Sequence, residues 1–233
     1  MGGWSILDYA LNDAPDPVPY LRLGYASYLS SWALLNTGTS ESNYGYWYPG
    51  KNNDGGASGD FEPRPWGRAW LGNKEMGRGP WWYSGEIDLG FTGALRTAAT
   101  IVVHDPIFGL FAYGGDLSQQ GAEIRVVPKD GLRARFDVVL GSNRLQLSTD
   151  RDGFARDRPI VFDQQLRRIA FTLENRGGAA HDTSISVHGL PAGTYTVSSG
   201  KLPSIRVEIH RDDITPITVP IGGDLTSVIL RRE

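Results

Sequence analysis

The chain has 233 residues, a formal net charge of -3 at pH 7, and no cysteine. This length suits one large domain or two small ones and is enough to bury a sizeable core. The near-balanced charge argues against nucleic acid or an anionic membrane as the main partner, because both require a concentrated basic face. Without cysteine, the chain can form neither disulfides nor cysteine-ligated zinc sites.

Membrane and export patterns are also absent from the sequence. No run of about 18 apolar residues occurs, so we expect no membrane-spanning helix. The first residues, MGGWSILDYALNDAPDP, have neither the basic start nor the apolar core of a signal peptide. The sequence therefore predicts a soluble chain and leaves its cellular location open.

The first predicted elements are two helices. A short helix is expected over residues 5–12, with Ser5 as its N-cap. Residues 19–36 carry apolar side chains at three- or four-residue spacing, and Pro19 suits a first helical turn.

An unusually long connector, residues 36–84, follows these helices. Loops beyond about 12–15 residues are uncommon and are usually functional or disordered. This one carries too much aromatic surface to remain solvated. Flat rings beside amides and carboxylates are typical of sugar-binding surfaces, although the same rings could form the core of a loop-rich half. The candidate substrate-binding residues are Tyr46, Trp47, Tyr48, Trp66, Trp70, Trp81 and Trp82.

Carboxylates near these rings could catalyse glycoside hydrolysis, which requires a proton donor and a second carboxylate as base or nucleophile. The candidate catalytic residues form two pairs, Asp60 with Glu62 and Glu86 with Asp88. A solvated or capping role is the alternative for each of them. Glu86 and Asp88 would in any case suit the N-terminus of a third helix, which we predict over residues 85–103.

The segment NNDGGASGD, residues 52–60, is rich in oxygen ligands. Asp54 and Asp60, with neighbouring amides and carbonyls, could hold a structural Ca²⁺, although the spacing does not match the helix–loop–helix calcium pattern. The four histidines are scattered without paired metal-ligand spacing, and the Gly-x-Ser-x-Gly motif of serine hydrolases is absent.

In the second half of the chain the periodicity changes to alternation of apolar and polar residues. Nine runs show it: residues 122–128, 132–140, 144–150, 168–176, 182–190, 194–199, 205–211, 214–220 and 225–232. Short strands at this spacing indicate an antiparallel β-sandwich. All seven tryptophans lie in the first 82 residues, so we place a boundary in the turn-rich segment 114–123. The predicted fold is α+β, with a helical, aromatic-loop-rich region over 1–115 and a β-sandwich over 116–233.

Three segments resemble the C-terminal part of a family of large, mostly uncharacterised bacterial proteins known as a domain of unknown function. They are LLNTGTSESNYGYWYPGKNNDGGASGDFEP, GPWWYSGEIDLGFTGALRTAATIVVHDPIFGLFAYGG and VVPKDGLRARF. The family is thought to comprise six-hairpin, (α/α) toroid glycosidase-like proteins with β-sandwich domains. The resemblance implies an exported parent and a sugar-active setting. A toroid needs many more helices than the three expected here, so either residues 1–115 are a remnant of one or the chain is a small stand-alone relative.

These observations support two main hypotheses for function. The first is a glycoside-hydrolase-like hydrolase, or a truncated part of one, acting on a carbohydrate or another small molecule. The second is a non-catalytic carbohydrate-binding or structural module. A metal-assisted ester or lactone hydrolase is a further alternative. Apolar helix faces without a barrel to cover them predict a homodimer, and a monomer in which the long loop covers its own helices is the alternative.

Overall fold

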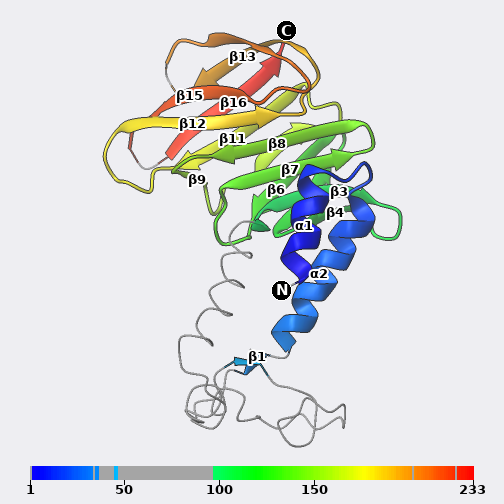
Figure 1. Ribbon diagram of the computed structural model, residues 1–233. Coiled ribbons are helices and arrows are strands. Elements are labelled where there is room, and N and C mark those ends of the chain that lie inside the picture. Colours follow the sequence, from blue (N-terminus) through cyan, green and yellow to red (C-terminus); the bar gives the residue numbers. More distant parts are fainter. Residues whose placement is uncertain (1, 34, 37–44, 47–96, 201, 224) are drawn as a thin grey trace, which may run out of the picture. The chain divides into compact units, whose positions relative to one another are not determined.

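The structure, a computed structural model, describes residues 2–33, 35–36, 45–46, 97–200, 202–223 and 225–233. The chain divides into two compact units, Met1–Thr97 (unit 1) and Ala98–Glu233 (unit 2) (Figure 1). The predicted boundary segment, residues 114–123, lies inside unit 2, where it forms strand β5 (Gly115–Gln120) and the first residue of β6 (Glu123–Pro128).

The described residues of unit 1 form two helices, α1 (Gly2–Asn12) and α2 (Val18–Ala33). Both helices were expected from the sequence. The carboxylate of Asp16 accepts a hydrogen bond from the backbone N–H of Val18 at 3.2 Å, which satisfies one of the free amides where α2 begins. Because α1 begins at Gly2, Ser5 lies within the helix, and its predicted N-cap role is wrong.

The two helices pack closely on each other. A Cβ atom added at Gly24 would lie 2.5 Å from Cδ2 of Leu7, so only glycine allows this approach without movement. The rings of Tyr9 and Tyr20 meet edge to face, with centroids 4.9 Å apart. Two short strands follow, β1 (Leu35–Asn36) and β2 (Gly45–Tyr46), and they pair antiparallel. Neither described helix is long and apolar enough to cross a membrane.

Unit 2 contains two sheets. The six-stranded sheet has the order β15-β12-β8-β7-β3-β4. Its strands are β3 (Thr100–Asp105), β4 (Gly109–Tyr113), β7 (Arg135–Leu140), β8 (Asn143–Thr149), β12 (His181–His188) and β15 (Thr215–Ile221). Among the described strands of both sheets, β3 and β7 form the one parallel pair. The six-stranded sheet is therefore mixed, which corrects the expectation of purely antiparallel pairing.

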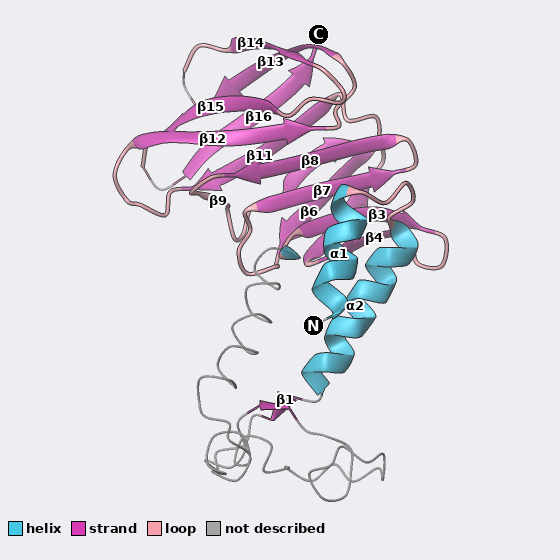
Figure 2. Cartoon of the chain, viewed as in Figure 1, coloured by secondary structure: helices cyan, strands magenta, loops and turns pink. Residues whose placement is uncertain are grey.

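The second sheet has eight strands in the order β14-β13-β16-β11-β10-β6-β5, with β9 also pairing with β11. Besides β5 and β6, its strands are β9 (Gly153–Phe154), β10 (Ile160–Asp163), β11 (Arg168–Glu174), β13 (Gly193–Ser199), β14 (Ile205–Ile209) and β16 (Leu225–Arg232). Both sheets contribute to one hydrophobic core, in which Phe136 and Val138 of one sheet join Phe162 and Phe171 of the other. Figure 2 shows unit 2 built of strands and connecting loops.

All nine alternating runs predicted in the second half are strands of these sheets. The predicted third helix is wrong over its last four residues, because Thr100–Asp105 form β3, which pairs with both β4 and β7. Ile101, Val102 and Val103 are β-branched and fully buried there, which favours a central strand over a helix. Residues 85–96 of that prediction lie outside the described residues.

Candidate functional site

The residues predicted to form an active or binding site fall almost wholly outside the part of the chain that the structure describes. Tyr46 belongs to β2. The others lie between residues 47 and 96 and remain predictions: the catalytic candidates Asp60, Glu62, Glu86 and Asp88, the metal candidates Asp54 and Asp60, and the substrate-binding candidates Trp47, Tyr48, Trp66, Trp70, Trp81 and Trp82.

Unit 2 has its own candidate site, a pocket of ≈ 590 Å³ at one end of the two sheets, which we call the amide pocket. It is lined by His104, Leu110, Gln119, Leu140, Gly141, Asn143, Gln164 and Gln165. These residues come from β3, β4, β5, β7 and β8 and from the β7–β8 and β10–β11 connections. Leu110 and Leu140 also pack against the shared core, so the pocket forms the end of the space between the sheets.

Two turns position the polar wall of the amide pocket. Gly141, with φ of 63°, provides the left-handed residue that closes the short β7–β8 turn. The side-chain amide of Asn143, directly after that turn, donates to the carbonyl of Gln164 at 2.9 Å. This bond joins a turn of the six-stranded sheet to a turn of the eight-stranded sheet.

The second of these turns is held by one carboxylate. Oδ1 of Asp163 accepts the backbone N–H of Gln165 at 2.8 Å, and Oδ2 accepts that of Arg168 at 3.1 Å. Leu166 lies in the core with a positive φ of 55°. Burial of Leu166 leaves Gln164 and Gln165 exposed at the pocket.

Four side-chain amides and one imidazole form the polar part of the pocket lining. The amides of Gln119, Asn143, Gln164 and Gln165 each offer donors and an acceptor. Two leucines supply apolar surface beside them. Among the described residues that line the pocket, none is an aspartate or a glutamate. The pocket can therefore bind a polar, uncharged ligand, but its described lining lacks the two carboxylates of glycoside hydrolysis.

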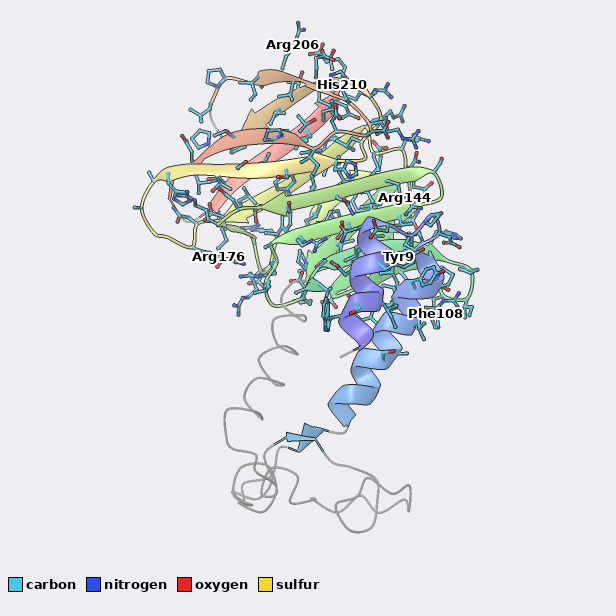
Figure 3. The ribbon with its side chains drawn as sticks, viewed as in Figure 1. Tyr9, Phe108, Arg144, Arg176, Arg206 and His210 are labelled. Atoms are coloured by element: carbon cyan, nitrogen blue, oxygen red, sulfur yellow. The ribbon has the colours of Figure 1, made fainter. Side chains whose placement is uncertain are left out.

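A second polar group lies around Asp152, in the β8–β9 connection, and we call it the Asp152 cluster. Asp152 is buried, and its Oδ2 lies 2.8 Å from Nε2 of His181 and accepts a hydrogen bond from the hydroxyl of Thr183. Its Oδ1 accepts the backbone N–H of Arg176 at 3.1 Å. Figure 3 shows Arg176 and Arg144 at opposite ends of unit 2, and Arg144 directly follows the pocket residue Asn143.

The hydrogen-bond partners of His181 in this cluster favour its protonated form. Its Nδ1 lies 2.8 Å from the carbonyl oxygen of Ala179, while Nε2 faces the Asp152 carboxylate. Both partners are acceptors, so both ring nitrogens must donate, which only the imidazolium can do. The bond to Ala179 and then the bond to Asp152 raise the pKa of His181, against the opposing effect of its desolvation.

The pKa of Asp152 moves in the opposite direction. Burial by itself would raise it, but the hydrogen bonds from Thr183, the Arg176 amide and His181 outweigh burial and place the pKa below the usual value. Because both His181 nitrogens are already bonded, the ring has no free lone pair with which to act as a general base. The Asp152 cluster therefore has a structural role, the anchoring of the β11–β12 connection.

A second pocket of ≈ 590 Å³ lies next to this cluster. His181 and Asp182 line it together with the exposed side chains of Leu202 and Leu225. Asn175 organises its rim by donating to the carbonyls of Ala179 and Gly222, each at 2.8 Å. Within the described residues, no cluster of three or more histidine, aspartate or glutamate side chains could hold a metal ion.

Neither the amide pocket nor the Asp152 cluster was found from the sequence. The pocket residues come from segments 6 to 21 positions apart, and none of them has a local motif. His181 follows a glycine- and alanine-rich turn, and its partner Asp152 precedes it by 29 positions. No usable signal pointed to Gln119, because it lies in the segment 114–123 that the sequence predicted as a turn-rich boundary and that instead contains β5.

Comparison with known proteins places the chain in one family. Residues 81–208, more than half of the chain, match the family of unknown function DUF5695, and the chain belongs to that family. No curated protein matches the chain. No solved structure matches it either.

Proposed function

We propose that this DUF5695 member is part of a carbohydrate-active protein, and that unit 2 is a β-sandwich module that binds neutral carbohydrate in the amide pocket. The observation that carries the proposal is the lining of the pocket: four side-chain amides, one imidazole and two leucines, with no described carboxylate. Such a set favours recognition of hydroxyl groups over acid–base chemistry.

The physical match is between amides and hydroxyls. A sugar hydroxyl both donates and accepts, and a side-chain amide offers both functions at fixed positions. The partly buried Leu110 and Leu140 provide an apolar surface for the C–H groups of a sugar ring. Because Asn143 already bonds Gln164, the two turns are ordered before a ligand binds, which lowers the entropic cost of binding.

Calorimetric titration of the chain with a panel of neutral oligosaccharides tests the proposal. Gln119 and Gln120 form a matched pair, because both are exposed on β5 while only Gln119 lines the pocket. We expect Gln119→Ala to weaken binding about fivefold and the double variant with Gln164→Ala about thirtyfold, since each lost bond contributes about 1 kcal/mol. Gln120→Ala should leave the affinity unchanged. Equal effects of Gln119→Ala and Gln120→Ala, or no binding to any member of the panel, would contradict the proposal.

The hydrolase hypothesis is a second proposal, which depends on carboxylates outside the described residues. It is supported by the pairing of acids with aromatic residues in the sequence. Glycoside, ester and lactone substrates, each with and without a chelator, test it. Asp60→Asn and Glu62→Gln should abolish any glycoside hydrolysis, and loss of activity on chelation alone would favour the metal-assisted alternative.

A further inference from the structure

The outer face of the eight-stranded sheet carries a row of arginines across neighbouring strands. In the register of the sheet, Arg168 of β11 lies opposite Arg231 of β16. Arg231 in turn lies opposite Thr196 of β13, which lies opposite Arg206 of β14. We propose that this row, the arginine row, binds the acidic groups of an anionic polysaccharide, with Arg168 and Arg231 as its centre.

Alternation along the strands fixes the direction of these side chains. Ile169 and Leu230, the neighbours of Arg168 and Arg231, are fully buried in the shared core, so the two arginines must lie on the opposite face. Both arginines are exposed. Figure 3 shows Arg206 projecting away from the sheets at the same outer strands.

Among the described residues, the nearest carboxylates form no ion pair with Arg168 or Arg231, and one of them pairs with Arg206 at the end of the row. Asp163 accepts the backbone N–H groups of Gln165, Arg167 and Arg168. Glu233 accepts the hydroxyl of Thr196 and Nε of Arg206, each at 2.8 Å. Arg168 and Arg231 are thus left as two like charges directly opposite each other, an arrangement that destabilises a sheet. An anion bound between them would offset this repulsion.

The geometry suits acidic sugars in a chain. Neighbouring strands lie about 4.8 Å apart, so the backbone positions of Arg168 and Arg231 are about 5 Å apart, and that of Arg206, whose Nε bonds Glu233, is about 10 Å beyond Arg231. Each guanidinium can bind a carboxylate or sulfate with two parallel hydrogen bonds. The outward residues Ala170, Thr172 and Thr196 are short, and both Arg168 and Arg231 are exposed to a polymer.

Nucleic acid fits this face less well. The whole chain has a net charge of -3, and nucleic-acid binding requires a dense array of phosphate contacts. The carbohydrate class of the polymer rests on the proposed function, but the arginine row is separate from the amide pocket. The two proposals can therefore fail independently.

Binding of polygalacturonate, measured by calorimetry at low and moderate salt, tests the inference. Arg168→Gln with Arg231→Gln should weaken binding about tenfold or more. Arg156→Gln with Arg158→Gln removes the same charge from two exposed arginines of the β9–β10 connection and should have no effect. Rising salt should weaken binding to the native chain, because exposed charges are screened. Arg168→Lys with Arg231→Lys should cause an intermediate loss of affinity, because lysine keeps the positive charge but cannot form the two parallel hydrogen bonds of a guanidinium.

Several outcomes would overturn the inference: equal losses in the two double variants, duplex DNA bound as tightly as polygalacturonate, or no binding at low salt. Fully methyl-esterified polygalacturonate should not bind at this site, and monomeric galacturonate or sulfate should bind far more weakly than the polymer. Gln119→Ala should leave binding of the acidic polymer unchanged. If it removes that binding, the acidic polymer occupies the amide pocket and the arginine row has no such role. Unchanged thermal unfolding of each variant confirms that its fold is intact.

Discussion

The protonated form of His181 makes the hydrogen bonds that stabilise unit 2. The stability of the folded chain should therefore depend on pH. The pKa of His181 in the folded chain is raised above the ordinary 6.5, first by the bond to Ala179 and then by Asp152. The stabilisation is therefore complete below pH 6.5 and is lost as the pH rises through the folded pKa. We expect His181→Gln to reduce stability at pH 6 more than at pH 9, as measured by urea unfolding. His210→Gln, an exposed control, should not change the pH profile. An NMR titration midpoint for His181 below 6.5 would contradict this assignment.

Asp137, on β7, presents a buried carboxyl whose burial raises its pKa from 3.8 to about 7, against the attraction of Arg135. Because the raised pKa favours the protonated form in the folded chain, the contribution of Asp137 to stability is greatest below pH 3.8 and is lost as the pH rises through about 7. Asp137→Asn removes this dependence and should stabilise the chain at pH 8 by up to about 4 kcal/mol, the equivalent of three pKa units.

Denaturant unfolding at pH 4 and pH 8 measures the effect of Asp137→Asn. Asp157→Asn, at an exposed position between β9 and β10, provides the control and should leave the stability difference between the two pH values unchanged. If Asp137→Asn were less stable than the native chain at pH 8, the ionised Asp137 carboxylate would be stabilised by a partner in the folded chain. That result would contradict the prediction.

At the scale of the elements, a hydrogen bond from Tyr195 holds β13 to the turn that precedes it. The buried Tyr195 donates its hydroxyl hydrogen bond to the carbonyl of Pro191 at 3.0 Å, four residues earlier. The arrangement resembles the tyrosine corner of β-sandwich domains, in which such a bond holds a strand at the edge of a turn. Tyr195→Phe keeps the ring and should destabilise the chain by about 1 kcal/mol in urea unfolding. Thr218→Val removes an exposed hydroxyl and should change stability by less than about 0.5 kcal/mol. Equal effects would mean that the Tyr195 bond contributes nothing.

The sequence predicted those strands that are buried on one face and partly exposed on the other. Val126 and Ile185, for example, alternate with partly exposed residues, and the period of two follows directly. β3 was missed because it lies between β4 and β7 and is buried on both faces, so Ile101, Val102 and Val103 give a continuous apolar run. Such a run does not distinguish a short strand from the end of a helix.

The amide pocket could not be predicted from the sequence for a different reason. Gln119 and Gln164 become neighbours in space only through the pairing order of the eight-stranded sheet, in which β5, β6 and β10 are adjacent. Pairing order depends on long-range contacts that one sequence does not reveal. The parallel pairing of β3 with β7, which places His104 at the end of the core, was unpredictable for the same reason.

At the scale of the whole molecule, the exposed apolar side chains of unit 1 bear on the predicted homodimer. Leu23 is 53 % exposed on α2, and Tyr20 is 38 % exposed on the same helix. Val102, which falls within the predicted third helix, lies instead in the core of unit 2, so the case for a homodimer rests on unit 1. A two-fold pair would bury the same patch on both chains and close without forming fibres.

Light scattering over a range of micromolar concentrations tests the homodimer. The chain has a mass of 25.5 kDa, so a dimer doubles the measured mass. Leu23→Glu should shift a dimer toward monomer, because it places a charge in an apolar contact that has no partner for it. Leu225→Glu changes an equally exposed leucine of unit 2 and should leave the mass unchanged. A mass near 25.5 kDa at every concentration would mean that the native chain is a monomer, and that the exposed residues of α2 serve no contact between copies.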